Sequence, residues 1–437
     1  MAMEDLYGKY VDAGYRVTTD SRTIKGGEIF FALRGENFDG NDYAMKALKD
    51  GASYAVVNDD AGLPDAPGLI KVPDPLHTLS ELAAFHRNHV RGKSVLPVIG
   101  LTGTNGKTTT KELIRAVLSA KYNVTATEGN LNNDIGVPLS LLKITPETEI
   151  AVIEMGANHP DDIAKLVKIS QPDYGLITNV GKAHLLGFGS FEGVKAAKGE
   201  LYKWLGSHKG SVIFLNEDDS DLKAMAAGEP CHVFGYGIRY QGAEILPTDA
   251  SSPFLRIRLD DDVVNTNLVG AYNATNVLAA LAIGEYFNVP RSDAVAAIAA
   301  YVPSNNRSQL MRAGSNTLIV DAYNANPSSM AVAIDNFSSF QAGRKLALLG
   351  DMRELGEDSV KEHIRIVDKV RESGLDACFV GEEFRKALDA TGRGYKWFAT
   401  SEELAAYLAG SRVEETAYLV KGSRGIRMEN VLKVIAG

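Results

Sequence analysis

The residues with the clearest chemical potential form a glycine-rich turn over 103–108, with the sequence Gly-Thr-Asn-Gly-Lys-Thr. An apolar stretch, 95–101, precedes the turn, and a helical pattern begins at Lys107. Backbone N–H groups at the start of a helix bind phosphate oxygens, so Lys107 would reach the β- and γ-phosphates of a nucleotide and Thr108 could hold Mg²⁺. The common phosphate-loop pattern has glycine where this chain has Leu101. The turn is therefore either a phosphate loop with a shorter glycine spacing or a capped strand-to-helix turn.

Polar side chains also end two further apolar stretches. Glu154 ends a strand-like run that begins at residue 149, where it could ligate the same Mg²⁺ or be a solvated acid. His184 follows the run 174–180 and could ligate a metal through a neutral imidazole, although a lone histidine is more often structural. Lys198 lies within a helical pattern, and its residue chemistry alone indicates an ordinary solvated lysine.

A second polar cluster precedes a helix that is predicted to start after Pro327. Six consecutive residues contain four polar or aromatic side chains, those of Asp321, Tyr323, Asn324 and Asn326. A single helix start needs only one capping residue, so this cluster exceeds what the helix requires. They could face a nucleotide across a cleft between domains, or the asparagines could shape the turn through Asx hydrogen bonds.

The elements that position these residues alternate between strand and helix, which predicts the α/β class. Nearly continuous apolar strands separated by helices indicate parallel sheets covered on both faces. We predict three domains: a small α/β domain over 1–78, a central phosphate-loop domain over 79–302 and a smaller doubly wound, Rossmann-like domain over 303–437. Ligands bind such sheets at the carboxyl ends of the strands, where the polar residues above are found.

Composition narrows the classes of function. The 437 residues, 45% of them hydrophobic and 23% charged, are typical of a globular protein with several domains. A net charge of -9 argues against a nucleic-acid partner. The two cysteines fit a reducing compartment, the N-terminus lacks the pattern of a secretory signal, and the longest apolar stretches are broken by charge. We therefore expect a cytoplasmic protein with no membrane partner, and a monomer.

Across most of its length the chain resembles the ATP-dependent Mur ligases of peptidoglycan synthesis. These enzymes share a Gly-Thr-x-Gly-Lys-[Thr/Ser] loop, which 103–108 matches with the family's shorter glycine spacing. The other matching segments are 129–142, 152–157, 321–330, 348–356 and 420–429. Within them, Tyr-Asn-Ala-Asn-Pro at 323–327 is similar to the branch that adds the dipeptide D-Ala-D-Ala to a UDP-linked tripeptide.

The resemblance implies an ADP-forming acid–D-amino-acid ligase that works through an acyl phosphate on UDP-N-acetylmuramoyl-tripeptide, whose third residue, lysine or diaminopimelate, stays open. The implied cofactors are ATP and two Mg²⁺ ions, with a CO₂-derived carbamate on Lys198. The implied catalytic residues are Lys107, Glu154, His184 and Lys198, and the metal ligands are Thr108, Glu154, His184 and Lys198. The implied nucleotide-binding residues are Gly103, Thr104, Asn105, Gly106, Lys107, Thr108, Thr109, Asn273, Asn276, Arg307 and Asp321. The implied substrate-binding residues are Ser21, Arg22, Asn133, Tyr323, Asn324 and Asn326.

Two positions depart from the family pattern. Tyr272 stands where relatives often have histidine before the adenine-side asparagine, and Asn306 where they commonly have glycine before the arginine. Three rival hypotheses remain: another ligase of this superfamily such as a folylpolyglutamate synthase, a phosphate-loop NTPase that acts as a conformational switch, and a catalytically silent binding protein. The uridine-type first domain and the 323–327 segment speak against the first of these.

Overall fold

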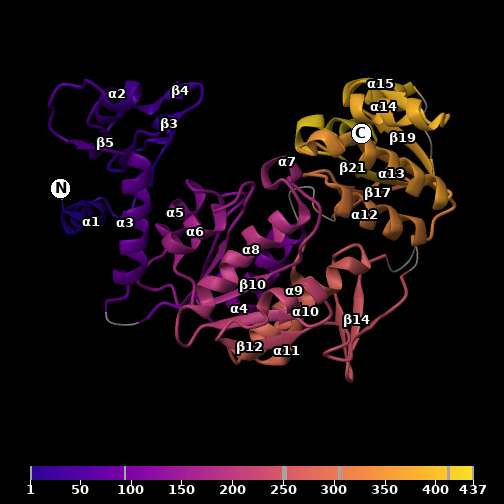
Figure 1. Ribbon diagram of the computed structural model, residues 1–437, viewed down its shortest axis with the longest axis horizontal. Coiled ribbons are helices and arrows are strands. Elements are labelled where there is room, and N and C mark those ends of the chain that lie inside the picture. The colour runs from indigo at the N-terminus through magenta and orange to yellow at the C-terminus, as the bar shows by residue number, and fades with distance from the viewer. Residues whose placement is uncertain are drawn as a thin grey trace.

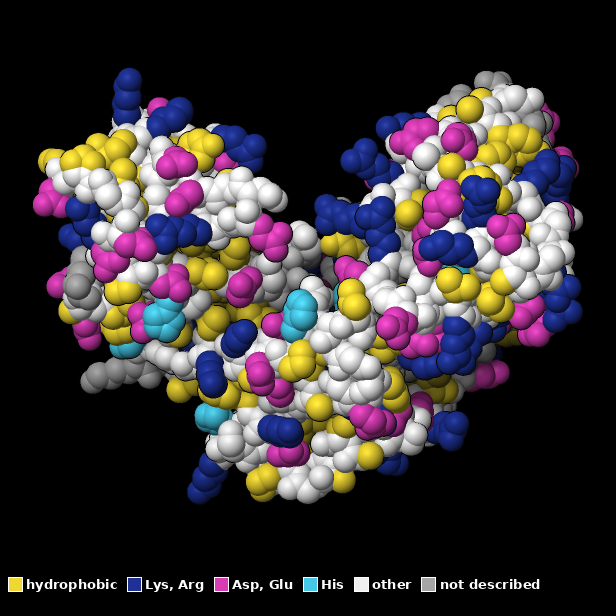
Figure 2. Space-filling model, turned by 45° about the horizontal axis from the view of Figure 1, so that its top comes forward, with side chains coloured by type: hydrophobic (Ala, Val, Ile, Leu, Met, Phe, Trp, Pro, Cys, Tyr) yellow, Lys and Arg dark blue, Asp and Glu magenta, His cyan; other side chains and the backbone are white. Residues whose placement is uncertain are grey.

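The computed structural model describes residues 2–92, 95–248, 253–303, 307, 309–410 and 414–435, so Asn306 lies outside the described residues. Figure 1 shows three lobes, which we call the first lobe (3–72), the middle lobe (98–300) and the C-terminal lobe (309–435). The molecule is hollowed between the first and the C-terminal lobes (Figure 2). Both of these lobes stand on the middle one, so the middle lobe forms the floor of the hollow.

The middle lobe is built on a six-stranded sheet in which all neighbouring strands run parallel. The strands are β7 (Val98–Thr102), β8 (Val124–Ala126), β9 (Ile150–Glu154), β10 (Tyr174–Ile177), β11 (Val212–Asn216) and β12 (His232–Tyr236), in the order β12-β11-β10-β7-β9-β8. Leu101 of β7 lies opposite Glu154 of β9, and Thr102 lies opposite Ile177 of β10. The loops after β7, β9 and β10 therefore start at one edge of the sheet.

Helices cover both faces of this sheet, and adjacent residues of β7 point into two different cores. Ile99 packs with α4 (Lys107–Ser119), α10 (Ala274–Tyr286) and α11 (Arg291–Ala300). Val98 packs with α5 (Gly136–Leu141), α6 (Asp162–Ser170) and α8 (Phe191–Gly206). Every residue of β7 is buried, which explains why its sequence is continuously apolar rather than alternating. The predicted parallel sheet with two covered faces is confirmed.

A long helix connects the first lobe to the middle lobe. The first lobe has a parallel sheet of β1 (Val17–Thr18), β2 (Ile29–Phe31), β5 (Tyr54–Asn58) and β6 (Leu69–Val72). Helix α3 (Pro75–His89) follows, capped by the Asp74 carboxylate, and packs on α1 (Met3–Asp12), α5 and α6. The boundary that we predicted between the first and the central domain, at residue 78, falls inside this continuous helix. The limits of the three domains stay a prediction.

The first and middle lobes share one hydrophobic core, to which α1, α3, α5 and α6 all contribute buried side chains. Tyr10 of α1 donates a hydrogen bond from its hydroxyl to the carbonyl of Leu142 at 2.5 Å. The Nε2 of His86 lies 2.8 Å from the carbonyl oxygen of Ile144. Burial lowers the pKa of His86 to about 4, so this imidazole is neutral at physiological pH. The two lobes are thus packed against each other as one body.

The C-terminal lobe has its own six-stranded sheet and its own cores. Its strands are β16 (Gln309–Ala313), β17 (Asn316–Asp321), β18 (Arg344–Gly350), β19 (Asp376–Val380), β20 (Lys396–Phe398) and β21 (Thr416–Lys421), in the order β16-β17-β21-β18-β19-β20. All pairs are parallel except β16 with β17. Asp321 and Lys421 are paired at the carboxyl ends of two neighbouring strands.

Two small antiparallel units were not predicted. One is a sheet of β13 (Glu244–Ile245), β14 (Arg256–Leu259) and β15 (Asp262–Asn265), and the other is the hairpin of β3 (Arg34–Gly35) and β4 (Phe38–Asp39). Buried and more exposed side chains alternate along β14, as expected for a sheet with one covered face. For the central domain we predicted only buried strands that alternate with helices, so an antiparallel sheet with one covered face departs from that prediction.

The remaining elements are short or lie in the C-terminal lobe. Among the described residues, no helix combines the length and the apolar character that a membrane span requires. The other α-helices are α2 (Ala44–Lys49), α7 (Leu185–Phe188), α9 (Ser220–Ala226), α12 (Pro327–Ser339), α13 (Ser359–Glu372), α14 (Glu382–Thr391), α15 (Ser401–Gly410) and α16 (Glu429–Ile435). The 3₁₀ helices are η1 (Ser21–Thr23), η2 (Gly40–Tyr43), η3 (Ala271–Asn273), η4 (Gly356–Asp358) and η5 (Arg424–Ile426).

Candidate active site

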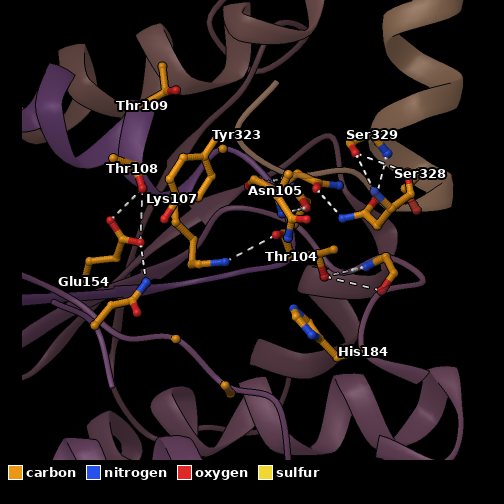
Figure 3. Close-up of a pocket in the computed structure, with 18 of the residues that line it drawn as sticks. Thr104, Asn105, Lys107, Thr108, Thr109, Glu154, His184, Tyr323, Ser328 and Ser329 are labelled. Carbon is orange, nitrogen blue, oxygen red and sulfur yellow. Dashed lines mark hydrogen bonds between the residues drawn. The ribbon is translucent and has the colours of Figure 1, made fainter. Parts of the chain in front are cut away.

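The predicted phosphate loop joins the end of β7 to the start of α4 (Figure 3). Gly106 precedes the helix with φ +78°, in the left-handed region that glycine adopts without strain. Gly103 has φ +147°, and a Cβ at this position would lie 2.0 Å from Oγ1 of Thr178. Lys107 donates from Nζ to the carbonyl oxygens of Gly103 (2.8 Å) and Thr104 (3.3 Å). The ammonium group thus lies against the same loop whose N–H groups would bind phosphate.

The end of the neighbouring strand β10 holds this loop in place. Thr178 donates from Oγ1 to the carbonyl of Asn105 at 2.6 Å, and Asn179 accepts from the N–H of Asn105 through Oδ1 at 3.0 Å. The N–H of Thr104 donates to the carbonyl of Asn179 at 2.9 Å. The loop conformation is therefore fixed by side chains that no sequence motif singles out.

We expect Gly103→Ala to destabilise the middle lobe by about 2–3 kcal/mol, because the new methyl group meets Thr178 and the φ angle suits only glycine well. Gly228→Ala is the matched control, since Gly228 also has a positive φ (+90°) but has no atom within 4 Å of an added Cβ. The control should cost about 1 kcal/mol from backbone strain alone. Urea unfolding of both variants measures the difference, and equal losses would refute the steric account.

Thr108 and Glu154 are brought together as predicted for a metal site. The Thr108 hydroxyl donates to the Glu154 carboxylate, with distances of 3.0 and 3.2 Å to its two oxygens. Asn132 donates from Nδ2 to the same carboxylate at 2.8 Å, and the fully buried Lys111 has Nζ 4.0 Å from it. Glu154 is itself only 1% exposed. This carboxylate is thus oriented from three sides.

The donor set fits Mg²⁺. Mg²⁺ prefers oxygen ligands and is usually held by one or two carboxylates together with phosphate oxygens and water. In the part of the chain that the structure describes, no group of three or more His, Cys, Asp and Glu side chains forms a ready-made metal cage. Thr108 and Glu154 therefore suit an ion whose coordination is completed by a bound nucleotide.

The charge of Lys107 lies close enough to Lys198 and His184 to lower the pKa of both. Lys198 is 2% exposed, and burial together with the charge on Lys107 lowers its pKa to about 7. Its Nζ lies 5.7 Å from the ring centroid of Phe188. Burial also lowers the pKa of His184, whose Nδ1 is in close contact with the carboxylate of Glu354 in the C-terminal lobe. The Lys198 amine is therefore partly unprotonated at neutral pH, unlike a solvated lysine.

The depressed pKa of Lys198 predicts a pH-dependent cost to stability. In the unfolded chain the Lys198 amine has its ordinary pKa near 10.5. Burying the charged amine therefore lowers the free energy of unfolding by its full amount below about pH 7, and by less as the pH rises toward 10.5. We expect Lys198→Met to raise the free energy of unfolding at pH 6 by on the order of 3 kcal/mol, and by less at pH 9, in CO₂-free buffer. The exposed Lys203 of the same helix supplies the control, Lys203→Met. A gain that is the same at both pH values would contradict the prediction.

The predicted residues converge on a cavity of about 770 Å³ between the middle and the C-terminal lobes. Gly103 and Lys198 do not line it, and Lys198 lies behind its wall in α8. The predicted residues that do line it are Thr104, Asn105, Gly106, Lys107, Thr108, Thr109, Asn133, Glu154, His184, Asn273, Asn276, Arg307, Asp321, Tyr323, Asn324 and Asn326.

The C-terminal lobe contacts the phosphate loop directly. Asn326 donates from Nδ2 to Oδ1 of Asn105 at 2.8 Å, while its own Oδ1 accepts from the N–H of Ser329 and caps α12. This asparagine therefore shapes the turn and also contacts the phosphate loop, and its role toward a nucleotide stays a prediction. The guanidinium of Arg307 lies 3.6 Å from the ring centroid of Tyr323.

Two other groups of predicted residues lie apart from the polar side chains around Lys107, and their roles stay predictions. Ser21 and Arg22 lie in η1 of the first lobe and do not line the cavity. Arg22 is exposed and paired with Asp20, whose pKa it lowers to about 2. Asn273 and Asn276 line the cavity but are almost fully buried, and they hydrogen-bond to each other at 3.0 Å.

Several residues of the site were not predicted, and besides Thr178 they include Asn132, Asn179, Lys111 and Lys421. Asn132 and Asn179 hold Glu154 and the phosphate loop, and Lys111 lies beside Glu154. Lys421, 1% exposed, forms an ion pair with Asp321 and donates to the carbonyl of Asn324 at 3.3 Å. The sequence does carry signals for three of them, since Asn132 adjoins Asn133, Lys421 lies in the matched segment 420–429, and Lys111 is a lysine among the apolar positions of a helix. Their roles depend on partners that are remote in sequence.

Comparison with known proteins defines the class to which this fold and site belong. The Mur ligase middle domain matches residues 101–284, the glutamate ligase domain of Mur ligases matches 306–424, and the Mur ligase family catalytic domain matches 15–87. Together with the full-length relatives below, these matches show that the chain belongs to the Mur ligase family.

Within that family, several relatives that match nearly the whole chain are D-alanyl-D-alanine-adding ligases by name. The UDP-N-acetylmuramoyl-tripeptide–D-alanyl-D-alanine ligase of Escherichia coli is 34% identical over 96% of this chain and 93% of its own length. The crystal structure of MurF from Acinetobacter baumannii has 30% identity and a TM-score of 0.85, covering 96% of this chain and 93% of that one. MurF from Thermotoga maritima, in complex with ADP, has 27% identity and a TM-score of 0.82, covering 96% and 97%.

Proposed function

We propose that the chain is an ATP-dependent, ADP-forming ligase that joins D-Ala-D-Ala to the tripeptide carboxylate of UDP-N-acetylmuramoyl-tripeptide, as the names of its full-length relatives say of those proteins. This is the last cytoplasmic step in making the UDP-linked pentapeptide precursor of peptidoglycan. The observation that carries the proposal is one cavity in which Lys107, Thr108 and Glu154 of the middle lobe face Asp321 and Tyr323 of the C-terminal lobe.

The reaction has two steps. An oxygen of the tripeptide carboxylate attacks the γ-phosphorus of ATP, and the bond from that phosphorus to ADP breaks. The amine nitrogen of the dipeptide then attacks the acyl carbon, the bond to phosphate breaks with its electron pair, and the nitrogen loses a proton. Lys107 and the loop N–H groups stabilise the charge on the phosphoryl oxygens. Asn326, hydrogen-bonded to Asn105, would help to hold the C-terminal lobe against the loop and so limit the access of water.

The metal ligands complete this arrangement. Thr108 and Glu154 would hold one Mg²⁺, and His184 with a carbamate on Lys198 would hold the second. Two Mg²⁺ ions neutralise and orient a phosphoryl group during transfer. A Lys198 pKa near 7 supports the carbamate, because only the unprotonated amine reacts with CO₂. In that reaction the neutral amine nitrogen attacks the carbon of CO₂, an N–C bond forms while one C–O π bond breaks, the nitrogen loses one proton, and the product is an anionic oxygen ligand.

The first lobe would hold the other end of the substrate, with Ser21 and Arg22 at the uridine diphosphate. These residues lie away from the cavity, so the substrate would extend across the hollow of Figure 2. The cysteines Cys231 and Cys378 are both free thiols, which supports a reducing cytoplasmic compartment. The monomeric state stays a prediction.

The test is release of phosphate from ATP with Mg²⁺, UDP-N-acetylmuramoyl-tripeptide and D-Ala-D-Ala, omitting each component in turn. We expect release only when both the UDP-tripeptide and the dipeptide are present, with a matching increase in the mass of the UDP product. Release that ignores both would indicate a nucleotide switch. Release that requires a folate and glutamate would indicate the folylpolyglutamate alternative, and no release at all would indicate a binding protein.

A further inference from the structure

Lys111 is a charged residue that the proposed mechanism does not use, although it lies directly behind the carboxylate of Glu154. It belongs to α4, one turn after Lys107, and is fully buried. Thr108 and Glu154 line the cavity, whereas Lys111 does not. We propose that Lys111 is a counter-cation that balances the Glu154 carboxylate when no metal ion is bound, and so keeps the free enzyme from binding a divalent cation tightly before the nucleotide arrives. The inference rests on the proposed ATP- and Mg²⁺-dependent function and adds a control of metal affinity to it.

Three oxygen atoms surround the ammonium group of Lys111. Its Nζ donates to the carbonyl oxygen of Thr127 at 2.5 Å, and it lies 2.9 Å from Oε1 of Glu112 and 4.0 Å from Oε2 of Glu154. Glu112 is partly exposed, so water compensates much of its charge, whereas Glu154 is buried. A buried carboxylate that loses its cation keeps an uncompensated charge. Glu154 therefore depends on Lys111 more than Glu112 does.

The other partners of Glu154 orient its carboxylate without balancing its charge. The hydroxyl of Thr108 and Nδ2 of Asn132 donate to the carboxylate at 3.0 and 2.8 Å (Figure 3). The backbone N–H of Glu154 donates to Oγ1 of Thr127 at 3.0 Å. Thr127 thus holds the backbone of Glu154 through its hydroxyl and the Lys111 ammonium through its carbonyl. Loss of the lysine charge would leave these neutral contacts to the carboxylate in place.

The separation of 4.0 Å leaves the Glu154 carboxylate available to a metal ion. A hydrogen bond between an ammonium group and a carboxylate is shorter, about 2.7–2.9 Å. Lys111 directs its hydrogen bond to the carbonyl of Thr127 instead, so it does not occupy a lone pair of Oε2 of Glu154. Lys107 donates to carbonyls of the phosphate loop and lines the cavity, where it would meet the nucleotide itself. Lys111 therefore acts on Glu154 through its charge alone.

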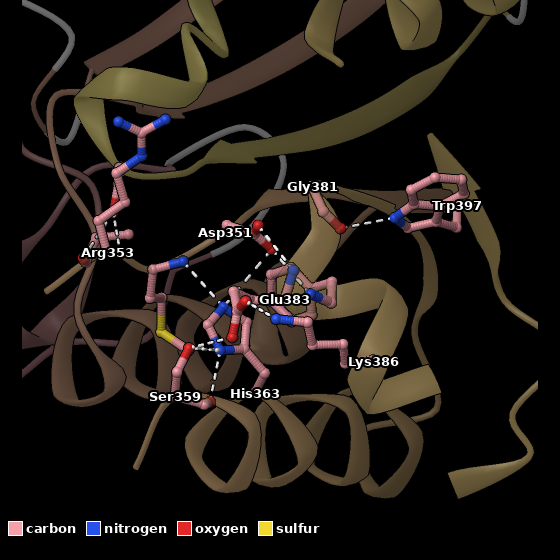
Figure 4. Close-up of polar contacts among 12 residues, drawn as sticks. Asp351, Arg353, Ser359, His363, Gly381, Glu383, Lys386 and Trp397 are labelled. Atoms are coloured by element: carbon pink, nitrogen blue, oxygen red, sulfur yellow. Dashed lines mark hydrogen bonds and ion pairs between the residues drawn. The ribbon is translucent and has the colours of Figure 1, made fainter. Parts of the chain in front are cut away.

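A buried carboxylate of the C-terminal lobe shows what neutral donors achieve without a cation (Figure 4). Asp351, 7% exposed, accepts from the N–H groups of Glu383 (3.0 Å) and Phe384 (2.9 Å) at the start of α14. Burial lowers the pKa of the neighbouring His363, so its imidazole is neutral. Burial nevertheless raises the pKa of the Asp351 carboxyl. Neutral donors thus leave part of the cost of burying a carboxylate uncompensated, and this is the part that we assign to Lys111 in the middle lobe.

The charge of Lys111 opposes a metal ion at Glu154. Two cations beside one carboxylate repel each other, and the repulsion is larger in a buried site than in water. Without Lys111 this repulsion is lost while Thr108 and Asn132 still hold the carboxylate, so the affinity for a divalent cation should rise rather than fall. In wild type the phosphate groups of ATP would supply the further negative charge that the ion needs. The metal ion would then enter with ATP and leave with ADP.

The experiment measures Mn²⁺ binding in the absence of nucleotide, by electron paramagnetic resonance, in wild type and in Lys111→Met. Methionine fills the space of the lysine stem without its charge. We expect Lys111→Met to bind Mn²⁺ roughly tenfold or more tightly than wild type. In EDTA the variant should melt roughly 5–15 °C below wild type, because the Glu154 charge is then unbalanced. Lys111→Met combined with Glu154→Gln should lose both the tight binding and the added instability.

Lys111→Gln is a second neutral variant, which keeps a hydrogen-bond donor for the carbonyl of Thr127 and should also bind Mn²⁺ more tightly than wild type. Lys168→Met is the control for the loss of one positive charge, because Lys168 is an exposed lysine of α6 that does not line the cavity, and its affinity for Mn²⁺ should stay within about twofold of wild type. Neutral variants that bind Mn²⁺ no more tightly than wild type would overturn the counter-cation while leaving the ligase intact. Mn²⁺ binding and turnover that Glu154→Gln alone does not reduce would instead overturn the proposed metal site.

Discussion

Lys107→Ala is expected to reduce ligase turnover by at least about 10³-fold, because it removes the cation nearest to the phosphate-binding N–H groups. Nζ of Lys107 lies 2.8 Å from the carbonyl of Gly103 inside the loop, and no other lysine or arginine contacts that carbonyl among the described residues. The loss should appear in kcat, since the interaction strengthens as charge develops on the transferred phosphoryl group. Steady-state phosphate release at saturating substrates measures it.

Lys203→Ala is the matched control for this substitution. Lys203 is an exposed lysine of α8, and its removal should leave turnover within about twofold of wild type. Thermal unfolding of both variants would establish that they are folded. If Lys107→Ala retained a tenth or more of wild-type turnover, the phosphate role of this lysine would be wrong.

Lys198→Ala is expected to reduce turnover about 10²- to 10³-fold, because the second metal site that we propose would lose a ligand. Short carboxylic acids such as formate or acetate should partly restore activity in a saturable manner, since a carboxylate can occupy the space of the lost carbamate. The structural basis is the burial of Lys198 beside Lys107 and His184, which lowers its pKa to about 7. Turnover measured against increasing acetate tests the rescue.

Two controls separate rescue from a general effect of the acids. Lys107→Ala should not respond to acetate, because the group that it lacks is a cation, and wild type should respond only weakly. Removal of dissolved CO₂ should lower wild-type activity, and bicarbonate should restore it. Wild-type activity in Lys198→Ala, or an absence of rescue, would count against the carbamate.

Sequence patterns predicted the parts of this molecule that local chemistry determines. A strand that is buried on both faces has an unbroken run of apolar residues. The strands β7, β9 and β10 could therefore be located from their residues alone. Parallel strands bring their carboxyl ends to one edge, and this rule is enough to place Glu154 beside the phosphate loop, where it accepts from Thr108. The cluster around Asn326 was found because a helix start does not need so many polar residues.

The parts that sequence patterns did not predict depend on partners distant in the chain. Thr178 and Asn179 hold the phosphate loop from about 70 residues away, and no local pattern marks them. The depressed pKa of Lys198 results from burial under Phe188 and from the charge of Lys107, so its sequence neighbours indicate only a solvated lysine.

The continuous core that joins the first and middle lobes has a consequence for which substrates can be used. Because α3 and the contacts of Tyr10 and His86 fix these lobes to each other, the separation between the η1 region and the phosphate loop is set by the protein. If the UDP end of the substrate binds at η1, as we propose, its peptide arm has to span this fixed separation. Its terminal carboxylate would then reach the γ-phosphate only when the peptide arm has the right number of residues. The packing of α3 would thus set the length of peptide that can react, and so the order in which residues are added to it.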